Sequence, residues 1–348
     1  MEYATVDESL RRGISPEFVG HLTSGVLLPV LERVRHDDTL SLEIRNGYVD
    51  IYYRGGRVLG IHGNGISGRF RAEFDTNYCN IDQAYRPTLP KEPPKIIAST
   101  DDATEWVEAL ASYKQVMDVF FSDNPKLERE FEQLAERANA RHKIGEESDY
   151  LVLDIEYTQS SLACPGWASD CRFDMVGFRW PIAGKTRGCR LVTPVIMEMK
   201  VGDGVITSHP VGGGGKLSPG LLKHVLDIEA FLKPAPGEDM SAPYRLLREE
   251  LQVILRTKQE LGLPTLPGAM ADLEIEGLTP RPEVLFVLAD HNPRSRKLAN
   301  ELERIARLPY GEHADYKVAT VTYGGYAIFR DNVVPLEDFN ATAKRGSS

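Results

Sequence analysis

Apolar and polar residues alternate along much of the first hundred positions, and this pattern predicts a small antiparallel sheet. A helix comes first, because Ser15-Pro16 is a typical helix start and apolar residues follow at helical spacing, interrupted by glycines and a proline. Residues 40–63 then alternate around Asn46-Gly47 and Gly55-Gly56, which are strong hairpin-turn sequences. Residues 69–74 continue the alternation. We therefore predict a three-stranded meander followed by a fourth strand.

The remainder of the chain has the pattern of a mixed α/β domain. Four prolines between residues 85 and 99 mark a connection, so we place the boundary near residue 95, with domains at 1–95 and 96–348. Two helices, three strands, two helices, a strand, a helix and final strands follow, a mixed sheet with helical cover. We expect the helices at about 101–121, 125–142, 218–232, 243–261 and 295–308, and the strands at about 150–158, 171–180, 194–201, 282–289 and 316–329.

Composition narrows the class of protein. The 348 residues are 42% hydrophobic and 26% charged, as in ordinary soluble proteins, which excludes intrinsic disorder and a collagen-like chain. Lys and Arg number 41 against 51 Asp and Glu, a formal net charge of −10. This balance argues against a protein that coats nucleic acid through its overall charge. A nucleic-acid partner would have to meet a local basic patch.

The sequence predicts a cytoplasmic protein without a membrane partner. Its apolar runs are much shorter than the roughly 20 residues that cross a bilayer. Acidic residues stand at the N-terminus where a secretory signal would be basic. The four cysteines have no CxxC spacing, and we interpret them as free thiols in a reducing compartment.

Two glycine-rich motifs do not carry the chemistry that they suggest. Gly63, Gly65 and Gly68 match GxGxxG, but the strand-like RFRAEF follows them instead of the helix that would hold a pyrophosphate. The GGGGKL segment ending at Leu217 lacks the hydroxyl residue that would bind magnesium in a phosphate-binding loop, and Pro210 replaces its first glycine. We reject both nucleotide-binding interpretations.

The acid and lysine in VIMEMK are the strongest candidates for chemistry. On a strand Glu198 and Lys200 share one face, opposite Met199. Asp174 lies among apolar residues on the preceding strand, where an ionised carboxylate needs a partner or a metal. Two neighbouring carboxylates suit Mg²⁺, and a lysine beside the metal can hold the attacking water. Such a set can hydrolyse a phosphodiester.

Around these residues the sequence resembles the PD-(D/E)XK, or restriction endonuclease-like, nucleases. The resemblance covers roughly residues 125–232 and implies a mixed sheet flanked by helices, behind an N-terminal antiparallel meander. It implies that Asp174 and Glu198 bind the divalent metal, that the Met199 carbonyl completes its ligands, and that Lys200 positions the water. Magnesium is the expected cofactor, and manganese is the other candidate.

The resemblance also implies a further acid on the preceding helix. Glu130 or Glu132 in LEREFEQL would supply it, and we prefer Glu130. The proline of the family motif is absent, since Phe173 precedes Asp174.

Two other interpretations compete with this site. Asp315-Tyr316-Lys317, with Asp290 upstream, has nearly the same spacing, but a helix is predicted between them where the family has a hairpin. Glu198 and Lys200 could instead be an ion pair on a solvated face, contributing less than about 1 kcal/mol.

Residues near the predicted site are candidates for supporting roles. Asp154 and Glu156 share a strand face and would hold a second metal or support the first, although a solvent-facing side is an equal alternative. The candidates for contact with substrate phosphates are Arg172, Lys216 and Lys223, with His209 and His224 nearby.

We therefore expect a Mg²⁺-dependent endonuclease that cleaves DNA, with RNA as the other candidate substrate. Members of the family act in restriction, repair and phage defence, and an enzyme that cuts both strands often works as a homodimer. The N-terminal domain would recognise substrate, regulate the enzyme or bind a partner. The alternative is a catalytically silent nuclease-like fold that binds a nucleic acid, a nucleotide or a protein.

Overall fold

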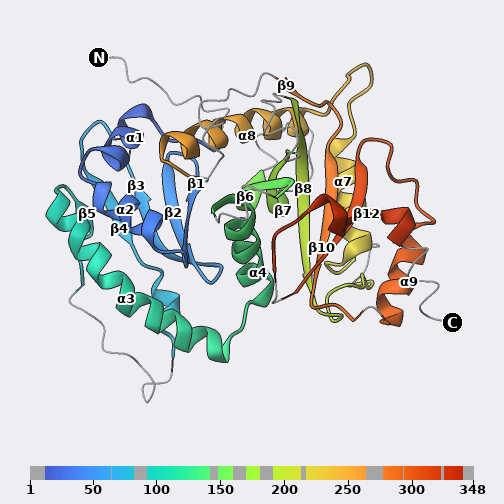
Figure 1. Ribbon diagram of the computed structural model, residues 1–348, viewed down its shortest axis with the longest axis horizontal. Coiled ribbons are helices and arrows are strands. Elements are labelled where there is room, and N and C mark those ends of the chain that lie inside the picture. The colour runs from blue at the N-terminus through green and yellow to red at the C-terminus, as the bar shows by residue number, and fades with distance from the viewer. Residues whose placement is uncertain are drawn as a thin grey trace. The chain divides into compact units, whose positions relative to one another are not determined.

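The protein is mixed α/β and contains two separate sheets (Figure 1). The computed structural model describes residues 12–63, 65–81, 92–141, 148–159, 170–180, 191–212, 217–263, 277–292, 294–322 and 325–339. The chain divides into two compact units: unit 1 holds residues 1–137 and 252–264, and unit 2 holds residues 138–251 and 265–348. This division differs from the boundary predicted near residue 95.

The sheet of unit 1 is antiparallel, with its strands in chain order. They are β1 (Leu40–Ile44), β2 (Tyr48–Tyr53), β3 (Gly56–His62), β4 (Phe70–Glu73) and β5 (Ile96–Ile97). The predicted meander and fourth strand are confirmed. The second hairpin turn lies one residue earlier than predicted, because Tyr53 pairs with Gly56 and leaves Arg54 and Gly55 as the loop. Both loop residues have positive φ, 50° and 70°, as a type I′ turn requires.

Unit 1 also contains α1 (Pro16–Thr23), α2 (Leu28–His36), α3 (Thr100–Asp123), α4 (Leu127–Glu136) and the last part of α8 (Ala242–Glu260). The Ser15 hydroxyl accepts a hydrogen bond from the Phe18 amide at 3.2 Å, as its predicted capping role requires. The predicted first helix is two helices, with Pro29 in the first turn of the second. Buried residues of the first three helices and of all five strands form one core, which also includes Leu261.

Helix α4 packs on the β2–β3 turn, which explains why it belongs to unit 1. The Arg54 guanidinium donates to Glu130 Oε1 at 2.9 Å and to Asp118 Oδ1 at 2.9 Å. The Gln133 side chain accepts the Gly55 amide at 2.7 Å. These contacts hold a non-glycine residue in the left-handed region, which costs about 1 kcal/mol or more.

A buried ion pair joins the two chain segments of unit 1. Lys258 on α8 donates to Glu43 Oε2 of β1 at 2.9 Å, and the Glu136 carboxylate lies 3.9 Å from the same ammonium group. All three side chains are almost completely buried. A charge in such a place is tolerated only with its partner.

The sheet of unit 2 contains seven strands among the described residues. Its principal order is β12-β11-β10-β8-β7-β6, and β9 pairs with β8 outside that path. β6, β7 and β8 form an antiparallel meander, β10 and β11 continue parallel to β8, and β12 is antiparallel to β11. The strands are β6 (Tyr150–Gln159), β7 (Cys171–Arg179), β8 (Leu191–Val201), β9 (Gly277–Leu278), β10 (Glu283–Ala289), β11 (Asp315–Val321) and β12 (Val333–Pro335).

Helices α7 (Leu221–Leu232) and α9 (Arg296–Ile305) complete unit 2, together with the first part of α8. Phe231 of α7 packs edge-on against Phe173 of β7, with ring centroids 4.9 Å apart. Gly177 of β7 is required for close strand approach, because a Cβ there would lie 2.0 Å from the Leu151 carbonyl oxygen. No helix in the described ranges is long and apolar enough to cross a membrane.

Candidate functional site

Asp174 lies where the ladder between β7 and β8 ends. The last pair in the register is Met175 opposite Met197. Beyond this pair, Asp174 Oδ2 accepts the backbone N–H of Met199 at 2.8 Å, so a side chain replaces the next ladder bond. The Asp174 side chain keeps 19% of its surface exposed, which leaves it accessible to a ligand.

Lys200 reaches the same point from β8. Its ammonium group donates to the Met199 carbonyl oxygen at 2.6 Å and lies 3.5 Å from Asp174 Oδ2. The lysine side chain is only 3% exposed. A buried ammonium group needs such oxygen partners, because its desolvation is otherwise costly. The structure thus brings together three of the predicted residues.

Glu198 is buried and contacts helix α7. Its side chain is 1% exposed, and Oε2 lies 2.9 Å from Nδ1 of His224. Continuing the β7–β8 register places Asp174 opposite Glu198. The sequence pattern indicates His224 only as a neighbour of the site. The signal that could have singled it out is its place in the first turn of the helix that follows the Glu198 strand.

A second buried acid anchors the beginning of α7. Glu301 of α9 accepts the backbone N–H groups of Ser208 at 2.8 Å and Leu222 at 3.2 Å. Its other oxygen pairs with Arg304 at 2.5 Å. Gly220 supplies no side-chain cap, so the Glu301 carboxylate does so from another helix. This anchor sets the position of the turn that carries His224.

The remaining predicted residues have other contacts. Arg172 forms an ion pair with Glu156, which has a positive φ of 53° on the bulged strand β6. Asp154 is fully buried on that strand. Lys223 pairs with Asp227 one turn along α7 at 2.5 Å. Lys216 lies outside the described residues.

Both candidate acids of the preceding helix lie on α4, which belongs to unit 1. Glu130 pairs with Arg54 in unit 1. Glu132 is buried on the same helix.

The competing Asp-x-Lys triplet does not form a site with Asp290. In the parallel register of β10 and β11, Glu283 lies opposite Asp315 and Ala289 lies opposite Val321. Asp290 therefore lies about seven residues along the strands from Asp315, roughly 23 Å at about 3.3 Å per residue. Lys317 pairs instead with the buried Glu283 at 2.9 Å.

The possible metal ligands beside Lys200 are all oxygens, namely the Asp174 and Glu198 carboxylates and the Met199 carbonyl. This donor set suits Mg²⁺, which commonly takes one or two protein carboxylates and completes its shell with water and phosphate oxygens. Among the residues that the structure describes, no group of three or more His, Cys, Asp or Glu is arranged to hold a metal ion. Any Mg²⁺ would therefore depend on few protein ligands.

Comparisons with protein-family models, with curated proteins and with solved structures found no match to this chain.

Proposed function

We propose that the protein is a Mg²⁺-dependent nuclease of the restriction endonuclease-like type that hydrolyses DNA phosphodiester bonds. The observation that carries the proposal is the meeting of Asp174, Met199 and Lys200 at the end of the β7–β8 ladder, with Glu198 on the same strand. The order of elements supports it: a helix, three antiparallel strands and a further helix follow one another along the chain, as the resemblance implies.

Each residue has a definite role in this proposal. Asp174 and Glu198 would hold the cation, and Mn²⁺ is the other candidate. When bound, the cation supplies charge neutralisation at phosphorus and acidifies a water molecule. Lys200, directed by the Met199 carbonyl and Asp174, would orient that water by hydrogen bonding. Glu130 stays the predicted further acid, and within unit 1 it pairs with Arg54.

His224 would act as a positioning residue for Glu198. A ligating carboxylate is commonly fixed by a second hydrogen-bonding group, and loss of such a group typically weakens metal binding about 10- to 100-fold. Since the contact is through Nδ1, asparagine can place an amide nitrogen near the same point, whereas leucine cannot. His224→Leu should therefore weaken Mg²⁺ binding measured by calorimetry, and His224→Asn should largely restore it. Equal affinities for wild type and the leucine variant would remove this role.

A cleavage panel tests the main proposal. Single- and double-stranded DNA and RNA are incubated with Mg²⁺, Mn²⁺ or EDTA, and we expect metal-dependent cleavage of DNA. Asp174→Asn, Glu198→Gln and Lys200→Met should each reduce the rate by at least about 100-fold, as loss of a group that stabilises the transition state does. Asp315→Asn is the matched control, because it alters the other Asp-x-Lys triplet, and it should remain active. Circular dichroism checks that each variant is folded.

The alternative is a catalytically silent nuclease-like fold that binds a nucleic acid, a nucleotide or a protein. It predicts that no nucleic acid is cleaved and that Mg²⁺ binds no more tightly to wild type than to Asp174→Asn. That pair of results would refute the nuclease. A homodimer and a role in restriction or phage defence rest on the resemblance alone and stay predictions.

A further inference from the structure

Three exposed cations lie close together in unit 2 without a carboxylate partner. They are Arg294, Arg296 and Lys297, in the segment that joins β10 to α9 and in the first turn of that helix. None of them forms an ion pair with a residue that the structure describes. Residues 294–297 contain no acid, so the local charge is +3 in a chain whose formal net charge is −10.

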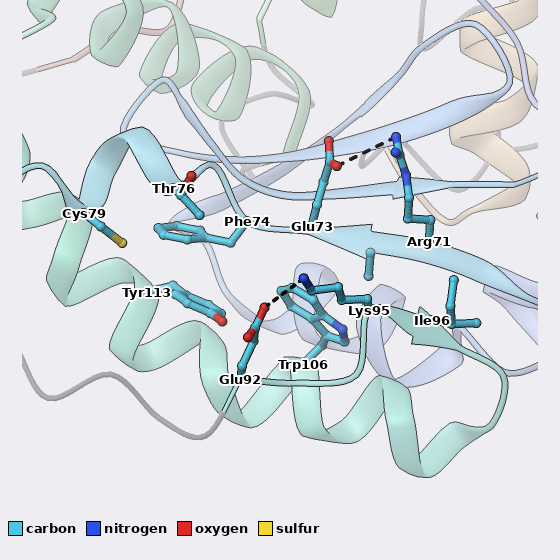
Figure 2. A pocket seen from close by; sticks show the side chains of 11 residues that line it. Arg71, Glu73, Phe74, Thr76, Cys79, Glu92, Lys95, Ile96, Trp106 and Tyr113 are labelled. Carbon is cyan, nitrogen blue, oxygen red and sulfur yellow. Dashed lines mark ion pairs between the residues drawn. The ribbon is translucent and has the colours of Figure 1, made fainter.

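Exposed cations elsewhere in the protein are commonly paired. Beside a cavity of unit 1, Arg71 lies 3.8 Å from Glu73 and Lys95 lies 3.7 Å from Glu92, although the arginine and lysine side chains are 61% and 80% exposed (Figure 2). In unit 2, Arg281 pairs with an acid in the same way. The three cations beside α9 therefore differ from much of the charged surface of this chain.

Arg296 and Lys297 also gain nothing from the helix that carries them. The first turn of α9 has no acidic residue, and Ser295 provides no side-chain cap. The helix dipole places partial positive charge at this end, so cations there are unfavourable. Removing them should leave unit 2 as stable as before or slightly more stable. Their charge is therefore better explained by an anion from outside the chain.

The segment that carries Arg294 leaves the sheet beside the strand that carries Lys200. Lys200 lies opposite Leu288 in the parallel pairing of β8 and β10. The Asn292 amide donates to Asp203 Oδ1 at 3.1 Å, and the Arg294 amide donates to the Asn292 side chain at 3.0 Å. Since Asp203 follows Lys200 by three residues, these links place the Arg294 backbone within roughly 25 Å of Lys200.

Helix α9 is also anchored beside the proposed metal site. Glu301, one turn after Lys297, accepts the Leu222 amide in the first turn of α7 at 3.2 Å. His224 in that turn lies 2.9 Å from the Glu198 carboxylate. The cations therefore belong to a segment that is fixed relative to the proposed site from both β8 and α7.

We propose that Arg294, Arg296 and Lys297 form a contact surface for the phosphate backbone of duplex DNA. The choice of DNA rests on the proposed function, and the surface would supply the local positive charge that a net charge of −10 does not. Each DNA strand carries a phosphate about every 3.4 Å, so roughly 25 Å spans about seven base pairs. The surface would contact phosphates within that distance of the scissile bond and would not read base sequence.

The salt dependence of DNA binding tests this surface. Fluorescence anisotropy with a labelled duplex measures binding with Mg²⁺ in the Lys200→Met background, and a second measurement uses the otherwise unchanged protein in EDTA. Each phosphate contact adds about −0.9 to the slope of log K against log salt. Arg296→Gln should therefore make the slope shallower by about 1, and glutamine at all three positions should do so by about 2–3, with affinity at low salt reduced at least about tenfold.

Lys233→Gln is the matched control for Arg296→Gln. Lys233 is exposed at the far end of α7, and it forms no ion pair with a described residue. This variant should leave the slope unchanged. Thermal unfolding of the triple glutamine variant should occur at or slightly above the wild-type temperature. Unfolding several degrees lower would mark the three cations as structural and overturn the proposal.

The outcomes separate this surface from the nuclease activity. DNA binding whose slope depends on the three cations, in a protein that cleaves no nucleic acid, would refute the nuclease and support the surface. Absence of DNA binding in both measurements, an unchanged slope in the triple variant, or an equal change in Lys233→Gln would overturn the surface. Tighter binding to vesicles of phosphatidylserine and phosphatidylcholine than to DNA would also overturn it.

Discussion

Replacing Glu301 with glutamine should loosen the beginning of α7 and lower the stability of unit 2. The carboxylate is fully buried, accepts the backbone N–H of Leu222 in the first turn of α7 and that of Ser208 in the segment before the helix, and pairs with Arg304. Hydrogen bonds to a charged acceptor contribute about 1.5–3 kcal/mol each, and those to a neutral one about 0.5–1.5 kcal/mol. With two bonds weakened and the favourable charge at the helix N-terminus removed, we expect a loss of about 2–3 kcal/mol. Glu301→Ala, which leaves both N–H groups buried without this acceptor, should cost about 3–5 kcal/mol.

Two measurements check this prediction. Thermal unfolding should shift downward by roughly 5–10 °C for Glu301→Gln, because 1 kcal/mol corresponds to about 2–4 °C in domains of 150–250 residues. Hydrogen exchange followed by mass spectrometry should show faster exchange in the peptide covering residues 221–232. Glu303→Gln on the same helix is the control, since Glu303 is exposed. If both glutamine variants unfold within about 0.5 kcal/mol of wild type, the anchoring argument is wrong.

Two further predictions concern unit 1. Lys258→Met removes the ammonium group from the buried Glu43 and Glu136 carboxylates and should destabilise the unit by about 3–5 kcal/mol in urea unfolding. Adding both Glu43→Leu and Glu136→Leu should recover most of the loss, and no difference between the single and the triple variant would contradict this. Burial tends to raise the pKa of Asp37, but hydrogen bonds from Lys114 and Thr39 lower it to about 2. The ionised Asp37 carboxylate should therefore contribute stability that is complete above its ordinary pKa of 3.8 and is lost as the pH falls from about 4 to about 2. Asp37→Asn should remove this pH dependence from the acid unfolding curve. An unchanged curve would refute the lowered pKa of Asp37.

Local patterns were enough to predict most strands and the positions of Asp174 and Lys200. Alternation reports which residues can share a strand face, and the short segment between β7 and β8 favours an antiparallel pair. These rules place Asp174 and Lys200 on neighbouring strands, whereas the role of the Met199 carbonyl came only from the family resemblance. They could not identify the partner of Glu198, because the apolar pattern of α7 does not determine which polar side chain of its first turn faces the sheet.

Membership of the two units was beyond local patterns for a different reason. An amphipathic helix such as α4 shows that it has a face to bury, but not which core receives it. Specific contacts decide this, namely Arg54 with Glu130 and Gln133 with Gly55. The contacts of Arg54 also bear on the β2–β3 turn, which lies one residue earlier than predicted. The ion pairs of Arg54 support this residue at positive φ, as the observed turn requires.

Because α8 returns the chain to unit 1 only after most of unit 2 has been made, the order of synthesis matters for folding. A ribosome adding about 5–20 residues per second needs on the order of 10 s to pass from the end of the first segment of unit 1 to the beginning of the second. During that interval Glu43 and Glu136 are already translated, while Lys258 is not. The nascent first segment must therefore wait with an incomplete core, and a fragment ending near residue 137 should be a substrate for chaperones and proteases.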